Sequence, residues 1–332
     1  MSCSLLLYSD HMTKSIHQAY PPAARKLGRA FEKKMKEMII EEPLSYNDKD
    51  TTMLLGIFST NIADRFRDRR DALRKTYLGV DDPRFCKLNE YIRQKEENNP
   101  ANSRCLVPYT FVIAGGGYSR PFDHGDDTPL TIHPNDIENE DCEDDCIYLN
   151  IRESMQRGKS ATFFKFGAEV AKRYGIDYIA KVDDDTIVHP DLLLRFMHDD
   201  LPPTPLNVRM YGGNTWATRE KQIFYGVGPF YFMSIDLADY VGNQLSSEDR
   251  LAMSHHNPIE DADMGVFVFS HERPIKYINL ASFKFFIHSR TTKRDNGIEL
   301  VWSTINRRYP TRPKALYPWA FLCNRWKYNM AT

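Results

Sequence analysis

The chain has 332 residues, of which 42% are hydrophobic and 12% aromatic, as expected for a globular protein with a sizeable core. Its 44 lysine and arginine residues nearly balance 45 aspartate and glutamate residues, so the net charge of −1 excludes general nucleic-acid binding through excess basic residues. No stretch approaches the roughly 20 apolar residues that a membrane-spanning helix needs, so we expect no membrane span.

The six cysteines are too few for a small scaffold held together by disulfides. Cys142 and Cys146 could form a local bridge or both remain free. A zinc site is not expected, because no second close pair of cysteines accompanies them. The cysteines therefore leave the redox compartment open.

An amphipathic helix is predicted near the start of the chain. Leu27, Phe31, Met35 and Met38 recur at helical spacing, with lysine and arginine on the opposite face. We therefore expect an amino-terminal helical extension over residues 1–50, which docks against one larger domain over 51–332. A partner or membrane surface is the alternative for the apolar face of this helix.

The first buried strand is predicted over residues 53–59, where apolar residues run for the length of a strand. The helix that follows carries many cations, including Arg70 and Arg74. Because a helix start and basic side chains both offer hydrogen-bond donors, they indicate an anion nearby. A basic face exposed to solvent explains the pattern equally well.

A second strand is predicted over residues 109–114, and a helix is predicted over residues 154–174. Lys159 lies near the start of that helix, where its ammonium group could lie beside a diphosphate. An ordinary surface lysine is the alternative.

Residues 176–185 form an apolar strand that ends in three consecutive carboxylates, Asp183, Asp184 and Asp185. Adjacent aspartates repel one another, and burying them without a cation is costly. At the carboxyl end of a strand in an α/β sheet, they point into the crevice where ligands bind. Carboxylate oxygens there suit Mg²⁺ or Mn²⁺ that holds a phosphate or diphosphate. An acidic turn is the alternative, but the preceding strand favours the metal site.

The prolines at 202–205 are a candidate seam between two halves of the molecule. Short strands are predicted on either side of Gly226 and Gly228, over residues 210–213 and 229–233. Glycines and aromatic residues gathered there fit the floor of a sugar-binding site, although core packing explains the aromatic residues as well.

Two further elements deliver polar groups. Glu260 and Asp261 begin a predicted helix, where the helix dipole favours carboxylates and capping is the simplest explanation. Residues 285–288 predict a strand that ends in His288. A lone histidine is more often structural than a ligand, so these two motifs carry weight only in combination with the others.

Taken together, these motifs resemble the β-1,3-galactosyltransferase family, glycosyltransferase family 31, over about residues 53–290. The most specific match is Lys-Val-Asp-Asp-Asp-Thr-Ile-Val-His-Pro-Asp at 181–191, which is similar to the family's Lys-Thr-Asp-Asp-Asp-Val-Phe-Val-Asn-Pro-Asp. Residues 69–77, 225–238 and 260–265 resemble the family's Arg-Arg helix, glycine-rich segment and Glu-Asp-Val motif, in the same order. The glycine-rich segment is degraded, and residues 155–160 resemble a version found in other branches.

The resemblance implies a GT-A fold, which is a Rossmann-like mixed α/β sheet flanked by helices in a single catalytic domain. It implies an inverting hexosyltransferase that moves galactose or an N-acetylhexosamine from a UDP-sugar to an acceptor hydroxyl in a β-1,3 linkage. The implied cofactor is Mn²⁺ or Mg²⁺, and the implied acceptor is a glycan, glycoprotein or glycolipid. The family's location implies the Golgi lumen.

The resemblance also implies roles for individual residues. Asp185 and His288 are expected to bind the metal. Asp261 is expected to be the general base, with Glu260 or Asp263 orienting it or contacting the acceptor. Expected on the nucleotide side are Ser59, Arg70, Arg74, Lys159, Asp183 near the ribose, and Asp184, which orients the site.

Three other functions remain open from the sequence. A metal-dependent nucleotide-diphosphate hydrolase could use the same aspartates, although the chain lacks a P-loop. A glycosidase could use Asp185 and Asp261 as acid and base, and it would need no metal. A non-catalytic carbohydrate- or partner-binding module could keep the fold without turnover.

Overall fold

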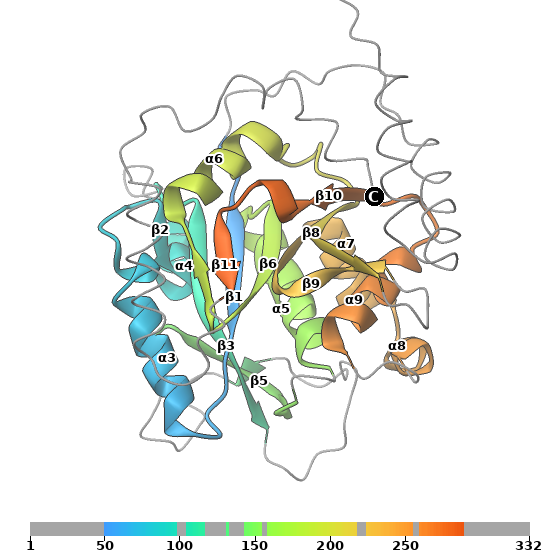
Figure 1. Ribbon diagram of the computed structural model, residues 1–332, viewed down its shortest axis with the longest axis horizontal. Coiled ribbons are helices and arrows are strands. Elements are labelled where there is room, and N and C mark those ends of the chain that lie inside the picture. The colour runs from blue at the N-terminus through green and yellow to red at the C-terminus, as the bar shows by residue number, and fades with distance from the viewer. Residues whose placement is uncertain are drawn as a thin grey trace, which may run out of the picture.

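The computed structural model describes residues 50–97, 104–116, 131–132, 143–154, 158–217, 224–254 and 259–288. Within these residues a nine-stranded sheet is flanked by helices, and its order is β10-β8-β9-β6-β1-β3-β5-β4, with β2 beside β3 (Figure 1). The predicted amphipathic helix and most of the predicted extension lie outside the described residues.

The strands are β1 (Met53–Phe58), β2 (Phe85–Lys87), β3 (Val107–Gly116), β4 (Thr131–Ile132), β5 (Cys146–Arg152), β6 (Tyr178–Asp183), β7 (Thr186–Val188), β8 (Met210–Ala217), β9 (Phe224–Ser234), β10 (Lys276–Asn279) and β11 (Phe286–His288). The helices are α3 (Asp64–Arg74), α4 (Leu88–Glu96), α5 (Lys159–Tyr174), α6 (Pro190–Asp200), α7 (Ile235–Asp239), α8 (Ser247–Ser254) and α9 (Glu260–Phe269). Short helical turns cover Tyr77–Gly79, Tyr240–Gln244 and Leu280–Ser282.

The central strands are mostly parallel, which confirms the predicted mixed α/β, Rossmann-like class. Strand β1 lies between β3 and β6 and is parallel to both, whereas β9 runs antiparallel to β6. The chain passes from β1 through β3 to β5 and then returns to β6 on the other side of β1. This reversal is the topological switch point, and open α/β sheets generally bind their ligands outside the carboxyl ends of the strands at such a point.

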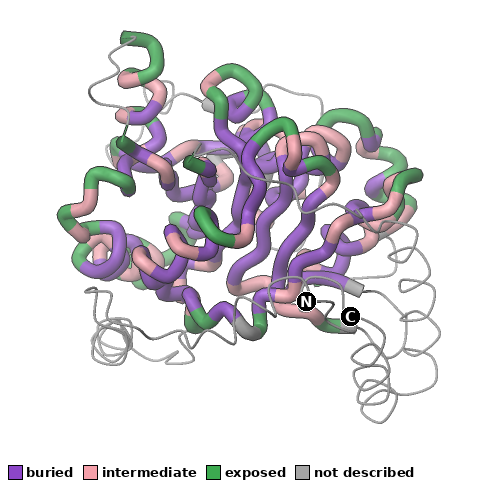
Figure 2. The backbone as a smooth tube through the Cα atoms, turned by 90° about the horizontal axis from the view of Figure 1, so that it is seen from above, coloured by how far each residue is buried: buried purple, intermediate pink, exposed green. Residues whose placement is uncertain are grey.

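Strand β1 is buried on both faces, because helices cover both sides of the sheet. Leu55 and Ile57 pack in one apolar cluster with residues of α6, whereas Leu54 and Phe58 pack in a second cluster with residues of α5. Figure 2 shows buried segments running through the centre of the molecule. A strand buried on both faces must be apolar along its whole length, which explains the continuous hydrophobic run in the sequence.

Gly56 allows α5 to approach the sheet closely. A Cβ atom at this position would lie 2.1 Å from the ring of Phe163, which stands on α5. Helix α5 begins at Lys159, five residues later than predicted, and Gly158 before it has a φ of 78°. Since positive φ suits glycine, this residue breaks the predicted helix and starts the observed one.

The proline-rich turn at 202–205 does not separate two domains. It connects α6 to β8, and β8 and β9 pair with each other in the same sheet as β6. The predicted seam is therefore wrong. No helix among the described residues is long and apolar enough to cross a membrane.

The structure contains a disulfide that the sequence did not predict. Cys86 and Cys105 are joined across 19 residues of sequence and connect the starts of β2 and β3. Cys146 is a free, buried thiol, and Cys142 lies outside the described residues, so the suggested local bridge is not described. The bridging cysteines are far apart in sequence, and only the pairing of β2 with β3 brings them together.

Candidate functional site

The three aspartates lie at the topological switch point. Asp183 ends β6 directly beside Phe58 at the end of β1. The next two aspartates form the turn between β6 and β7, and β11 pairs antiparallel with β7 so that His288 stands opposite Thr186. Strand pairing therefore brings a histidine from far along the chain to the acidic turn.

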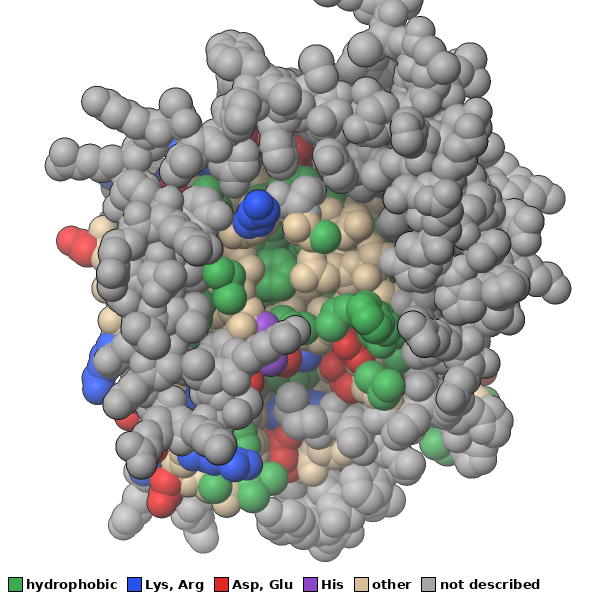
Figure 3. Space-filling model, in the orientation of Figure 1, with side chains coloured by type: hydrophobic (Ala, Val, Ile, Leu, Met, Phe, Trp, Pro, Cys, Tyr) green, Lys and Arg blue, Asp and Glu red, His purple; other side chains and the backbone are tan. Residues whose placement is uncertain are grey.

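Asp183, Asp185 and His288 can each offer one ligand atom, and these atoms all lie within 4.8 Å of one another. His288 Nε2 is 3.1 Å from Asp185 Oδ1. Figure 3 shows acidic side chains beside a histidine near the centre of this face, with basic side chains next to them. Two carboxylates and an imidazole suit a divalent metal ion. We call these three residues the metal-capable cluster.

The pKa of Asp185 agrees with a cation-binding role. Burial would raise this pKa, but the hydrogen bond and charge of His288 and the charge of Arg69 outweigh burial and lower it. Arg69 Nη2 lies 3.9 Å from Asp185 Oδ2. The carboxylate is therefore ionised at neutral pH and available to a metal ion.

Asp184 points into the protein. Its carboxylate accepts hydrogen bonds from Ser59 Oγ at 2.8 Å and from Arg69 Nη1 at 2.8 Å, and the residue is only 5% exposed. Burial raises the pKa of Asp184 to about 6, although Arg69 and Ser59 lower it. These contacts tie the acidic turn to the end of β1 and to α3, in agreement with the expected orienting role.

Asp261 faces the same space as the metal-capable cluster. The backbone N–H of Gly228 donates to Asp261 Oδ2 at 2.7 Å. A Cβ atom at Gly228 would lie 3.3 Å from Asp261 Oδ2 and 3.7 Å from Asp183 Oδ2, so both carboxylates lie beside this glycine. Burial, followed by the charge of Glu260, raises the pKa of Asp261 to about 6, a value that suits a general base.

Glu260 is held by several partners at the base of the site. Tyr231 Oη donates to Glu260 Oε1 at 2.6 Å, and the hydroxyl of Ser160 donates to the same oxygen. Lys181 Nζ lies 3.4 Å from Glu260 Oε2. Burial alone would lower the pKa of Lys181, but the carboxylates of Asp183 and Glu260 outweigh burial and raise it, so Lys181 is charged.

Arg70 does not have the free donors that nucleotide binding requires. Its Nε and Nη2 groups bind Glu143 at 2.8 Å, and Nη2 also donates to Asn61. Its Nη1 group donates to Ser59 Oγ and to the carbonyl of Thr60. These bonds use all five N–H donors of a guanidinium group, so the structure argues against the predicted role of Arg70 in nucleotide binding.

Arg74 is occupied in a similar way. It binds both carboxylate oxygens of Asp145 at 2.8 and 2.6 Å, and it also contacts Glu143 and Asp71. An arginine held by three carboxylates is an ion-pair partner within the fold. These contacts support a structural role for Arg74 and argue against its predicted role in nucleotide binding.

Lys159 is buried rather than exposed to a ligand. Its ammonium group donates to the carbonyl of Ser59 at 2.5 Å and to both carboxylate oxygens of Glu153 at 2.9 Å. An ammonium group has three N–H donors, and these contacts account for all of them. The structure thus argues against the prediction that Lys159 lies beside a diphosphate.

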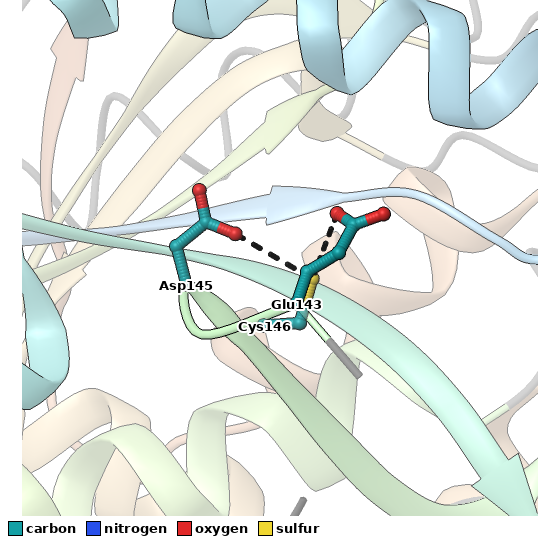
Figure 4. A group of neighbouring side chains, drawn as sticks. All are labelled: Glu143, Asp145 and Cys146. Atoms are coloured by element: carbon teal, nitrogen blue, oxygen red, sulfur yellow. Dashed lines mark hydrogen bonds between the residues drawn. The ribbon is translucent and has the colours of Figure 1, made fainter. Parts of the chain in front are cut away.

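Glu143, Asp145 and Cys146 form a second group whose polar atoms lie within 4.8 Å of one another (Figure 4). Cys146 Sγ lies 3.4 Å from Glu143 Oε2 and 3.8 Å from Asp145 Oδ1. Arg70 and Arg74 already neutralise both carboxylates, and burial raises the pKa of the Cys146 thiol far above its usual range. This group is therefore an ion-pair cluster that holds α3 against β5, not a metal site.

We expect Glu143→Gln to destabilise the fold by about 3 kcal/mol, because it leaves Arg70 partly unpaired in a buried position. Burial raises the pKa of Glu143, but hydrogen bonds from Arg70 and Arg74 lower it to about 2. The contribution to stability is therefore complete above the ordinary pKa of a glutamate and is lost as the pH falls through about 2. Urea unfolding at neutral pH measures the loss.

Asp144→Asn is the matched control for this prediction. Asp144 pairs with Lys87 at 2.7 Å on the surface, where its side chain is 72% exposed. The control should cost less than about 1 kcal/mol, as is typical of exposed ion pairs. Equal losses in both variants would contradict a structural role for the arginine cluster.

Arg69 and Lys181 are the two site residues that the sequence did not identify. Arg69 stands next to Arg70 in a helix with many cations, and composition alone cannot show which one faces the aspartates. Lys181 lies within the most specific motif, but its position in a buried strand gave no sign of a role. The alternation of side chains along β6 could have indicated that Lys181 shares a face with Asp183.

No protein-family model matches the chain, and no curated protein matches it.

Proposed function

We propose that this chain is a metal-dependent inverting hexosyltransferase with a GT-A fold, which transfers a sugar from a UDP-sugar to a hydroxyl group of an acceptor glycan. The observation that supports this proposal is the position of Gly228, where an added Cβ atom would lie within 4 Å of the carboxylates of both Asp183 and Asp261. A metal-capable cluster and a carboxylate of raised pKa thus face one space. Transfer from a nucleotide sugar requires a metal site for the diphosphate and, close to it, a base for the acceptor hydroxyl.

Asp183, Asp185 and His288 would hold Mn²⁺ or Mg²⁺, and their oxygen and nitrogen donors fit either ion. The bound ion would supply charge stabilisation for the departing diphosphate. Arg69, which already contacts Asp184 and lies near Asp185, adds a second positive charge at that end of the site.

Asp261 acts at the opposite end of the site. It accepts the proton of the acceptor hydroxyl as that oxygen forms its bond to the anomeric carbon of the sugar. The bond between the anomeric carbon and the diphosphate oxygen breaks, and its electron pair leaves with UDP. Attack from the face opposite the leaving group inverts the configuration at the anomeric carbon.

The identity of the sugar and the linkage come from the motif resemblance. We propose galactose or an N-acetylhexosamine as the transferred sugar and a β-1,3 linkage to a glycan, glycoprotein or glycolipid. We also propose the Golgi lumen as the compartment. The Cys86–Cys105 bridge supports an oxidising compartment, where disulfides persist, and peptide mapping without reductant would detect it.

The experiment that tests the function measures UDP release from a panel of UDP-sugars with Mn²⁺, with and without acceptor saccharides, before and after addition of a chelator. A transferase releases UDP with one donor, and an acceptor increases this release. A nucleotide-diphosphate hydrolase would produce UMP, and a glycosidase would keep its activity in the chelator. Binding without turnover on any donor and acceptor would contradict the proposal and indicate a binding module.

A further inference from the structure

Lys181 is a buried ammonium group in the middle of the candidate site. The residue is 2% exposed, and its Nζ lies 2.5 Å from Asp183 Oδ1 and 3.4 Å from Glu260 Oε2. It also donates to the carbonyl of Gly228 at 2.9 Å. These three partners belong to β6, α9 and β9, so one side chain joins three of the elements that contribute to the site.

The surroundings of Lys181 keep it away from a substrate. Its Nζ forms a hydrogen bond with the carbonyl of Gly228 and ion pairs with Asp183 and Glu260, and the residue is only 2% exposed. Its Nζ also lies 5.5 Å from the ring centre of Phe58 and 5.6 Å from that of Tyr231, so aromatic rings lie beside it. Lys181 is thus enclosed by protein groups and acts through them.

Gly228 connects Lys181 to the proposed base. Its carbonyl accepts from Lys181 Nζ, and its N–H donates to Asp261 Oδ2 at 2.7 Å. Two hydrogen bonds of this one residue therefore link Lys181 to Asp261. On its other side, Lys181 holds Asp183 of the metal-capable cluster directly.

We infer that Lys181 is a positioning residue that fixes the spacing between the metal-binding carboxylate Asp183 and the base Asp261. The inference rests on the proposed function and adds a residue to it. An ion pair buried in a protein is often replaceable by apolar packing without loss of stability, so stability alone is a weak explanation for this one. A displacement of reacting groups by about 1 Å can cost about 100-fold in rate, which gives Lys181 a large effect without any contact with substrate.

The first test is Lys181→Met, which keeps the length of the side chain and removes its charge. We expect kcat for UDP release to fall by about 100-fold. Mn²⁺ affinity of the protein alone, measured from the electron paramagnetic resonance signal of free Mn²⁺, should stay within about 10-fold, because all three metal-capable residues remain. Lys172→Met is the control: Lys172 pairs with Asp239 on the surface and is 53% exposed, so kcat should not change.

A charge-balanced variant covers the case in which Lys181→Met unfolds. Lys181→Met combined with Glu260→Gln removes both members of one pair, so it should recover the melting temperature that the single variant loses. If Lys181 also positions Asp183 and Gly228, kcat of the double variant should be at least about 10-fold below that of Glu260→Gln alone. Equal kcat in these two variants would show that Lys181 only neutralises Glu260, and would overturn the inference.

The two proposals fail in different ways. If the wild-type protein turns over no donor, the proposed function is wrong and the positioning role fails with it. If the wild type releases UDP and Lys181→Met does so at a rate within about 3-fold, the positioning role alone is overturned. Loss of both Mn²⁺ binding and turnover in a folded charge-balanced variant would also overturn it, because Lys181 would then be needed for the metal site itself.

Discussion

Asp261→Asn is expected to lower kcat by about 10² to 10⁴-fold while Mn²⁺ and UDP bind as they do in the wild-type protein. Asparagine keeps the size of the side chain and can accept the hydrogen bond that Gly228 donates to Asp261 Oδ2. It cannot accept a proton from an alcohol at neutral pH. Single-turnover UDP release, compared with UDP binding by calorimetry, separates the loss of proton transfer from a loss of binding.

Asp249→Asn is the control for this variant. Asp249 occupies the first turn of α8, where its side chain accepts hydrogen bonds from Ser246 on the surface. The control exchanges the same groups at a comparable position in another helix and should leave kcat unchanged. Turnover near the wild-type rate in Asp261→Asn would remove Asp261 from the role of base.

The pH dependence of transfer follows from the same residue. Burial and the charge of Glu260 raise the pKa of Asp261 to about 6, and only the ionised carboxylate can accept a proton. The rate of transfer should therefore rise with pH through about 6 and level off above it. The residual rate of Asp261→Asn should not show this rise with pH. A wild-type rate that stays constant from about pH 5 to about pH 8 would contradict the assignment.

Asp185→Asn is expected to weaken Mn²⁺ binding by more than about 100-fold and to abolish transfer at ordinary metal concentrations. Asp185 belongs to the metal-capable cluster, and its contact with His288 orients the imidazole ring. Loss of its charge removes an anionic ligand and the partner of His288 together. A titration followed by electron paramagnetic resonance of free Mn²⁺ measures the change.

The control for this variant is Asp199→Asn, in the helix α6 that follows the acidic turn along the chain. Asp199 is an exposed residue of α6 whose carboxylate pairs with His198, so this variant repeats the loss of an aspartate beside a histidine outside the site. Its Mn²⁺ affinity should equal that of the wild-type protein. If Asp185→Asn also keeps wild-type affinity, the metal-capable cluster does not bind the ion.

The elements that could be predicted from the sequence are those whose local pattern is decisive. Strand β1 is apolar throughout because both of its faces are buried, and the apolar start of β6 leads to Asp183 at its end and to the two aspartates that follow. The local residue pattern of such segments is enough to predict their structure. The predicted starts and ends were less accurate, as the late start of α5 at Lys159 shows.

Side-chain partners between distant segments could not be predicted in the same way. The pairing of Arg70 and Arg74 with Glu143 and Asp145 depends on the contact of α3 with the start of β5, which no local pattern specifies. A basic helix next to a strand end indicates an anion nearby, and here that anion belongs to the protein itself. The sequence therefore located the acidic turn at the end of β6, but it could not show that Arg70 and Arg74 pair with carboxylates of the protein.

The position of Arg69 illustrates the limit most clearly. Neighbouring residues in a helix point about 100° apart, so Arg69 and Arg70 face different groups although they are adjacent. Arg69 contacts Asp184, whereas Arg70 binds Glu143. Only the packing of α3 against the sheet decides which of the two arginines lies beside the acidic turn.

The most direct test of the central claim is a calorimetric titration of UDP into the wild-type protein with and without Mn²⁺, repeated with Asp185→Asn. If the acidic turn holds a metal ion that binds the diphosphate, UDP affinity in the wild type should rise at least about 10-fold on addition of Mn²⁺, and Asp185→Asn should lose this increase. UDP binding of equal strength with and without the ion, or no UDP binding in either condition, would contradict the account.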